Sequence, residues 1–212
     1  MYLFSRRARL APGNTRAAMA WATDITEKAS QVGGLPLSLY AQVFSPMVGT
    51  IVWSTFAPDL AALEAATDKL NADDGFISAS DAGAKFVLTD EDDALLQVVY
   101  GEPDPNRKVE YVTSVQTVCA NGNVARGIEL GIEIAQKAEK IIGSAGMFAT
   151  AATGSYGSVA WLSGYADVNE LDRAQQKLAA DTKFAEFIDK SVPGVYTDEP
   201  TASRQVILRR IV

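Results

Sequence analysis

Residues 50–76, TIVWSTFAPDLAALEAATDKLNADDGF, have a close match 108 positions later in the same chain. The match is residues 158–184, SVAWLSGYADVNELDRAQQKLAADTKF. The identical pairs include Trp53 and Trp161, Asp59 and Asp167, Leu63 and Leu171, Ala66 and Ala174, Lys69 and Lys177, Leu70 and Leu178, Asp73 and Asp181, and Phe76 and Phe184. A match held at one fixed spacing predicts two copies of one module, fused head to tail.

The match extends in both directions and sets the predicted module bounds. Toward the C-terminus the spacing stays at 108. Near the start it becomes 109, and the matching residues include Tyr2 and Tyr111, Ser5 and Ser114, Gly13-Asn14 and Gly122-Asn123, and Lys28 and Lys137. Residues 101–107 contain two prolines and no apolar side chain outside them, a composition typical of a linker. We therefore predict a first module over 1–101, a linker over 102–108 and a second module over 109–212.

Each module has hydrophobic patterns in the order strand, helix, strand, strand, helix, strand. In the first module these fall at residues 2–10, 15–32, 37–44 and 50–56, in a helix capped by Asp59, and at 94–100. Asp167 is the equivalent cap in the second module, and Glu170 three residues later resembles a capping box. This order is the ferredoxin-like βαββαβ arrangement, so the predicted fold class is α+β.

The composition excludes several classes of function. The chain has 212 residues and a net charge of −7, which disfavours nucleic acid and anionic membranes as partners. It has no histidine, which excludes Ser-His and Cys-His nucleophile pairs, His-ligated haem and the common catalytic zinc sites. Cys119 is the one cysteine, and no long apolar stretch is present. We expect a soluble, cytoplasmic protein with an inert, buried thiol.

The second helix of each module carries a shared motif, Leu70-x-x-Asp73-x-x-Phe76 and Leu178-x-x-Asp181-x-x-Phe184, which we expect at the end of that helix. With this motif inside the element order above, the chain resembles the dimeric α+β-barrel superfamily. The resemblance implies two ferredoxin-like modules whose antiparallel sheets pack face to face around a cavity within one chain. Pairing between chains is the alternative, and exposed sheet edges also favour a homodimer of tandem chains.

The resemblance also limits the function. The superfamily includes cofactor-free monooxygenases, isomerases and haem enzymes, and the lack of histidine separates this chain from the His-ligated haem branch. A ligand site should then consist of polar side chains at alternate positions of the strands. Arg7 is the first candidate, because a guanidinium in a cavity would hold a carboxylate or enolate oxygen. A solvated or ion-paired arginine is the alternative, and Gln116 stands at the equivalent position of the second module.

Four further residues complete the predicted ligand site. Trp53 and Trp161 could stack on a flat ligand, although burial in the core is the other interpretation of a tryptophan kept in both copies. Tyr40 and Gln42 could donate hydrogen bonds from the first module. The repeated Thr89-Asp90-Glu91 and Thr197-Asp198-Glu199 are interpreted as turns and not as a metal site, because they lack a calcium-loop pattern.

Two hypotheses for function follow. The first is an enzyme that acts on a small, oxygenated, mostly apolar compound without a cofactor or metal, as a monooxygenase or an isomerase. Its weakness is the base, since no carboxylate is expected on the strand positions that face the predicted cavity. The second is a binding or assembly protein with a filled barrel and no turnover. An open, polar cavity would favour the first hypothesis, and a cavity filled by side chains would favour the second.

Overall fold

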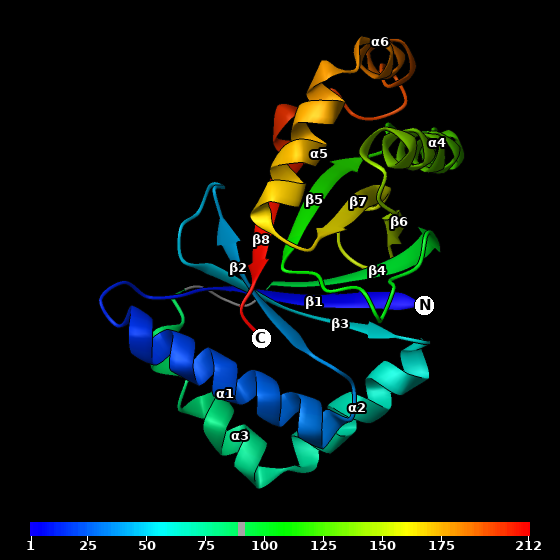
Figure 1. Ribbon diagram of the computed structural model, residues 1–212. Helices are drawn as coiled ribbons and strands as arrows, with labels where there is room; N and C mark the ends of the chain where they lie inside the picture. The colour runs from blue at the N-terminus through cyan, green and yellow to red at the C-terminus, as the bar shows by residue number, and fades with distance from the viewer. Residues whose placement is uncertain (89–91) are drawn as a thin grey trace. The chain divides into compact units, whose positions relative to one another are not determined.

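The computed structural model describes residues 1–88 and 92–212 and has a mixed α+β fold (Figure 1). The chain forms two compact units. Unit 1 consists of Met1–Leu95 together with Arg209–Val212, and unit 2 consists of Leu96–Leu208. The division falls inside β4 and β8, the last strand of each half of the chain.

The same order of elements occurs in both halves of the chain. The first half contains β1 (Tyr2–Arg9), α1 (Thr15–Gly33), β2 (Ser38–Val43), β3 (Thr50–Ala57), α2 (Leu60–Ala72), α3 (Asp74–Asp81), η1 (Ala84–Phe86) and β4 (Asp92–Tyr100). The second half contains β5 (Tyr111–Val118), α4 (Val124–Ile142), β6 (Gly146–Ala151), β7 (Ser158–Tyr165), α5 (Val168–Ala180), α6 (Thr182–Ser191), η2 (Pro200–Ala202) and β8 (Arg204–Arg210).

In unit 1 the antiparallel strands β1 and β2 both pair with β3, which is therefore central. Beyond β2, the backbone of Leu39 exchanges hydrogen bonds with Ile211 and Val212 at the C-terminus. Helices α1, α2 and α3 lie on one side of these strands (Figure 1). Strand β2 ends one residue earlier than predicted, because Phe44 has a φ of 50° and leaves the extended conformation.

In unit 2, β5 and β6 both pair with β7, and β6 also pairs with residues 96–100 of β4. Helix α4 packs on β6 and β7, and α5 packs on β7. The last strand of the first half thus supplies its C-terminal residues to the sheet of unit 2. Periodicity identified β4 as a strand but could not identify its partner, since alternation of side chains is the same beside any neighbour.

The prediction that one helix ends in the Leu-x-x-Asp-x-x-Phe motif is wrong in both halves. Asp73 has extended backbone angles and ends α2, and its Oδ1 accepts the backbone N–H of Phe76 at 2.6 Å as the N-cap of α3. Asp181 does the same between α5 and α6, accepting from Phe184 N at 2.8 Å. An aspartate side chain competes for backbone donors in this way, so the motif marks a junction between two helices.

The predicted caps of α2 and α5 are confirmed. Asp59 accepts the backbone N–H of Ala62, and Asp167 accepts that of Glu170, each at 2.8 Å. The Glu170 carboxylate does not close a capping box on Asp167, because its Oε2 accepts the N–H of Ala166 at 2.6 Å instead. Glu170 thereby fixes Ala166, one of the two residues between β7 and α5.

Each unit has a core between its strands and its helices. In unit 1 the buried cluster includes Leu39, Ile51 and Trp53, with α1 contributing Ala18, Ala22 and Ile25. In unit 2 the cluster is Cys119, Leu130, Ala135, Phe148, Val159 and Tyr196. Cross-strand partners share a face of an antiparallel sheet, so Trp53 and Trp161 both lie on the helix-covered face.

Candidate functional site

Unit 2 contains a cavity of about 420 Å³ on the helix-covered side of its strands. Its walls are mostly apolar and come from β5, β6 and β7, from helices α4, α5 and α6, and from the chain around η2 and β8. The apolar part of the wall includes Val115, Ile134, Ala138, Leu178 and Ile188. All of the lining residues belong to unit 2, so the cavity is defined within one compact unit.

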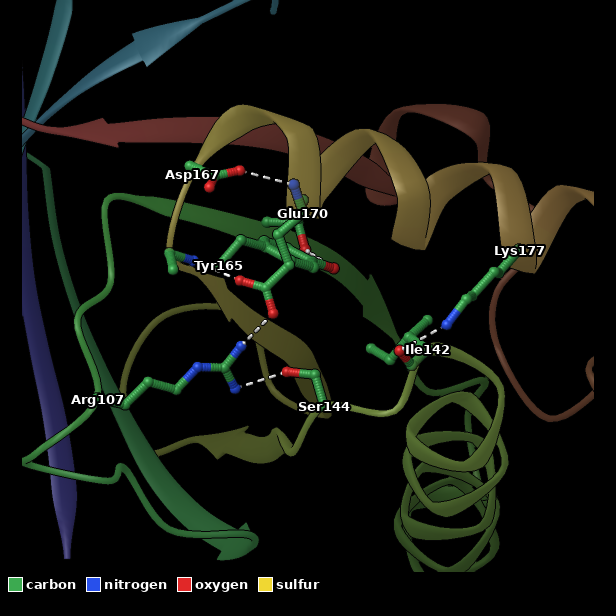
Figure 2. Close-up of polar contacts among 9 residues, drawn as sticks. Arg107, Ile142, Ser144, Tyr165, Asp167, Glu170 and Lys177 are labelled. Carbon is green, nitrogen blue, oxygen red and sulfur yellow. Dashed lines mark hydrogen bonds and ion pairs between the residues drawn. The ribbon is translucent and has the colours of Figure 1, made fainter.

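Two hydroxyl groups lie together on the strand side of the cavity. Thr113 on β5 and Tyr165 at the end of β7 both line it, and Thr113 Oγ1 lies 3.5 Å from Tyr165 Oη. The side chain of Tyr165 is almost fully buried, with 1% of its residue surface exposed. Its phenol points back toward β5 beside the start of α5 (Figure 2). A long, weak contact of this kind leaves both groups able to bind a ligand oxygen.

One carboxylate, that of Glu139 on α4, lines the cavity. Its Oε1 accepts the backbone N–H of Gly146 at 2.9 Å, and its Oε2 accepts the Tyr100 hydroxyl at 2.8 Å. The hydrogen bond to the carboxylate raises the pKa of Tyr100, so the phenol stays protonated and acts as the donor. The carboxylate is therefore held in one orientation by two donors from different elements, β4 and β6.

Glu139 is not among the residues predicted from the sequence, because it comes from a helix and the predicted ligand residues lie on strands. A signal for it exists in the sequence. Gly131, Ala135 and Ile142 form one stripe on α4 at helical spacing, and Glu139 falls on that stripe. A charged residue on an otherwise apolar, core-facing stripe needs a partner or a function, so the break in the pattern points to the site.

Aromatic side chains form part of the cavity wall. Trp161 donates its indole N–H to the carbonyl of Gly131 at 2.8 Å and lies 5.5 Å, edge to face, from the ring of Tyr196. The Tyr196 hydroxyl donates to the carbonyl of Gly127 at 2.6 Å, and burial raises its pKa. Burial also raises the pKa of the Cys119 thiol, which confirms the expected buried cysteine. These groups are committed to the core and are poor candidates for chemistry.

A polar network ties the predicted linker to the elements beside the cavity (Figure 2). Arg107 donates to Ser144 Oγ at 2.6 Å and to Glu170 Oε1 at 2.8 Å. Lys177 on α5 donates to the carbonyl of Ile142 at 3.4 Å. Arg107 thus bridges the turn after α4 and the first turn of α5, and so anchors this part of the predicted linker on unit 2.

The predicted site residues divide between the two units. Gln116 and Trp161 both line the cavity of unit 2. Gln116 Nε2 donates to Ser114 Oγ at 3.2 Å, and Arg204 donates to Gln116 Oε1 at 3.2 Å. Arg7, Tyr40, Gln42 and Trp53 lie in unit 1.

In unit 1 these candidates have partners of their own. Arg7 forms an ion pair with Asp92, as in the alternative interpretation of Arg7 as an ion-paired strand arginine. Trp53 donates its indole N–H to Thr26 Oγ1 at 2.8 Å inside the core, and Gln42 donates to the carbonyl of Pro46. Burial raises the pKa of Tyr40, which nearby Arg210 partly offsets. Arg7 and Tyr40 face the side of the sheet opposite Trp53, so these residues do not form a single site.

The structure holds no cluster of three or more Cys, Asp or Glu side chains suited to a metal ion within residues 1–88 and 92–212. In Thr197-Asp198-Glu199, Glu199 N donates to Thr197 Oγ1 at 3.2 Å, a local contact of the kind expected of turn chemistry. Thr89-Asp90-Glu91 lies outside the described residues. No helix in the described part of the chain has the length and apolar character needed to cross a membrane.

Comparison with solved structures identifies proteins of the same architecture. A candidate monooxygenase of Fusobacterium nucleatum superposes with a TM-score of 0.72 at 11% identity, covering 100% of this chain and 92% of that one. A candidate monooxygenase of Lactobacillus acidophilus gives 0.66 at 10% identity, with 99% and 93% covered. An anthrone oxidase-like protein gives 0.66 at 11% identity, with 100% and 91% covered.

The fold is that of the dimeric α+β-barrel proteins. The likeness covers the whole chain, as the sequence resemblance implied. No family model matches the sequence, and no curated protein matches it either. At 10–11% identity, the likeness shows a shared fold alone, and the chemistry has to be argued from the cavity.

Proposed function

We propose that this protein binds a small, flat, mostly apolar and oxygenated molecule in the cavity of unit 2, and oxygenates it without a cofactor. The observation that carries the proposal is the cavity itself, with about 420 Å³ of space behind mostly apolar walls. Ligand pockets typically have volumes of roughly 300–1,000 Å³, apolar walls and a few convergent polar groups.

The charge of the lining restricts the ligand. The described residues that line the cavity include one carboxylate, Glu139, and no lysine or arginine. A carboxylated or phosphorylated ligand would bring a second negative charge into an apolar site with no cation to balance it. A neutral ligand fits better, with a carbonyl or hydroxyl oxygen within reach of the hydroxyls of Thr113 and Tyr165.

The class of reaction is supported by the similar structures, which include two candidate monooxygenases and an anthrone oxidase-like protein. An anthrone is a suitable probe, because its methylene group lies next to aromatic rings conjugated with a carbonyl and loses a proton readily. In its oxygenation one atom of O2 becomes the new carbonyl oxygen, and the other leaves with both methylene hydrogens as water. Such a reaction needs a base and a water-poor pocket, but no metal or flavin.

The test is anthrone binding and O2 consumption by the purified protein, with formation of anthraquinone followed by absorbance. The cavity variant Thr113→Phe, which places the equivalent residue Phe4 of unit 1 in the wall, should abolish binding. Phe4→Thr is the matched control and should leave binding unchanged. Binding without O2 uptake would favour the non-catalytic hypothesis. Exchange of the anthrone methylene hydrogens with solvent, without O2 uptake, would favour an isomerase. No binding of anthrone or related neutral tricyclic ketones would contradict the proposal.

The polar residues of unit 1, the duplication and the assembly state are further proposals. Arg7 and Tyr40, with Gln42, would form a second polar face in unit 1, where the Arg7 guanidinium holds an anionic oxygen in exchange for Asp92. The tandem duplication, with modules at 1–101 and 109–212 whose sheets pair within one chain, would account for the repeated order of elements. A homodimer of such tandem chains is the corresponding proposal for assembly.

A further inference from the structure

The two halves of the chain form an equivalent hydrogen bond with different residues. In each half, a side chain on the last turn of the first helix accepts the backbone N–H at the start of the next strand. In unit 1, Leu37 N donates to Ser30 Oγ at 3.0 Å. In unit 2, Gly146 N donates to Glu139 Oε1 at 2.9 Å. At the 109-residue spacing of the repeat, Ser30 corresponds to Glu139 and Leu37 to Gly146.

A serine hydroxyl is therefore sufficient for this junction. The Ser30 hydroxyl accepts from Leu37 and donates its one proton to the Thr26 carbonyl at 2.9 Å, so both of these hydrogen bonds stay within unit 1. A carboxylate at the same place brings a negative charge to the wall of an apolar cavity, which costs free energy in solvation. The fold does not require that charge, so the second oxygen of Glu139 needs another explanation.

The second carboxylate oxygen of Glu139, Oε2, is held in a fixed position by its own hydrogen bond. Glu139 Oε2 accepts the Tyr100 hydroxyl at 2.8 Å, and Glu139 lines the cavity. An ionised carboxylate has about four acceptor positions, and the two donors from Gly146 and Tyr100 occupy two of them. Tyr100 is placed by Gly101, which has a φ of +75° and whose added Cβ would lie 2.2 Å from the carbonyl oxygen of Gly146. The chain approaches β6 closely there because residue 101 is glycine.

We propose that Glu139 is the proton acceptor of the cavity and that Tyr100 is its positioning residue, acting on a neutral carbon acid whose C–H bond is activated by a carbonyl group. The inference rests on the proposed function, because it names the base of the same cavity. In the step, the C–H bond breaks and an O–H bond forms on Glu139. The electron pair delocalises onto the ligand's carbonyl oxygen, and the proton later returns or passes to solvent. This supplies the base that a chain without histidine otherwise lacks.

The experiment is hydrogen–deuterium exchange of the anthrone methylene in D2O without oxygen, followed by mass spectrometry. It measures proton removal alone, since exchange involves no net oxidation. General-base catalysis typically contributes roughly 100- to 10,000-fold, and Glu139→Gln should lose an acceleration of that size while still binding anthrone. Glu139→Ser, which copies unit 1, should lose it equally. Both variants keep an acceptor for Gly146, so folding should persist.

Two further variants separate chemistry from structure. Glu133→Gln removes another carboxylate from α4, one that pairs with Lys137 at 3.7 Å and does not line the cavity, and should leave exchange unchanged. Tyr100→Phe should slow exchange by roughly 10-fold, less than Glu139→Gln does, and should leave the anthrone dissociation constant unchanged. The substitution keeps the carboxylate of Glu139 but removes one of the two donors that fix its orientation.

The outcomes distinguish this inference from the proposed function. Exchange that depends on Glu139, without O2 uptake, would support the base and contradict the oxygenase. O2 uptake that is the same in Glu139→Gln and in the wild type would contradict the base and keep the oxygenase. Exchange at the wild-type rate in Glu139→Gln, or a wild-type protein that gives no exchange above buffer, would overturn the assignment of Glu139.

Discussion

Unit 1 and unit 2 fill the contact between helix and sheet with side chains of complementary size. At the 109-residue spacing, Ala22 of α1 corresponds to Gly131 of α4, and Leu39 of β2 corresponds to Phe148 of β6. Unit 1 thus combines a larger helix residue with a smaller strand residue, and unit 2 does the reverse. Both versions are fully buried. The scaffold tolerates a change of side chain when its partner compensates in volume, as expected for a close-packed interior.

At the cavity, the side chains of the two units no longer compensate for each other in size. The wall of unit 2 carries Thr113, Val115, Tyr165 and Glu139, whereas the equivalent residues of unit 1 are Phe4, Arg6, Ala57 and Ser30. Two of the strand positions hold longer side chains in unit 1, and Arg6 there forms a two-pronged ion pair with Asp93 at 2.8 and 2.9 Å. One fold can thus keep its capping and junction contacts while the polar groups around this cavity occur in unit 2.

The largest expected effect on stability comes from enlarging the small helix residue that packs on Phe148 in unit 2. A Cβ added to Gly131 would lie 2.1 Å from Phe148 Cζ, so Gly131→Ala should destabilise the protein by about 3 kcal/mol through overpacking. Phe148→Leu in the same chain copies unit 1 and should recover part of that loss. Urea denaturation followed by circular dichroism measures both. The reverse change, Ala22→Gly, should cost less, about 2 kcal/mol, from helix propensity and the loss of one buried methyl group.

A double variant no more stable than Gly131→Ala alone would show that the two units do not share this packing rule. The Phe148→Leu single variant is needed as well, because Phe148 also contacts Trp161 with ring centroids 5.2 Å apart. The coupling between the two changes, and not either single value, is the quantity that decides.

A medium and equal effect is expected where the two units are the same. Asp73→Ala and Asp181→Ala each remove an N-cap acceptor, and each should cost about 1 kcal/mol. Asp73→Asn and Asp181→Asn keep an acceptor oxygen and should cost much less. Denaturation midpoints of the four variants test the prediction. A loss in one unit several times that in the other would show that the helix junctions are not equivalent.

Much of the fold could be predicted because it depends on local signals. The β-strands of the first half, the helix ended by Gly34 in the left-handed conformation, and the caps at Asp59 and Asp167 follow from periodicity and side-chain chemistry. The partner of β4 and the break at Asp73 depend on contacts that no local pattern encodes. These features needed the structure.

The site was harder to predict for the same reason. A ligand site was sought on strand positions, and two of its candidates, Gln116 and Trp161, do line the cavity. The carboxylate is on α4, and its partner Tyr100 is 39 positions away in the sequence. Composition showed that histidine could not be the base, but which carboxylate lies in an apolar wall is a property of packing.

The smallest expected effect on stability lies at a strand position where the two units differ in charge. Arg7 corresponds to Gln116, and Arg7→Gln therefore makes unit 1 resemble unit 2. The Arg7–Asp92 pair is exposed, with 30% and 63% of the two side chains accessible, so its loss should change the free energy of unfolding by less than about 1 kcal/mol. Salt should reduce this difference further, since exposed charges are screened.

This small structural cost makes Arg7→Gln a clean test of a ligand role in unit 1. Native mass spectrometry of protein purified from its own host would show whether a bound small molecule is retained. If Arg7 holds an anionic oxygen, Arg7→Gln should lose the molecule at unchanged stability, whereas Asp92→Asn should retain it. If retention instead follows Thr113→Phe and ignores Arg7→Gln, the molecule belongs to the cavity of unit 2, and the arginine is an ordinary ion-paired residue of the first strand.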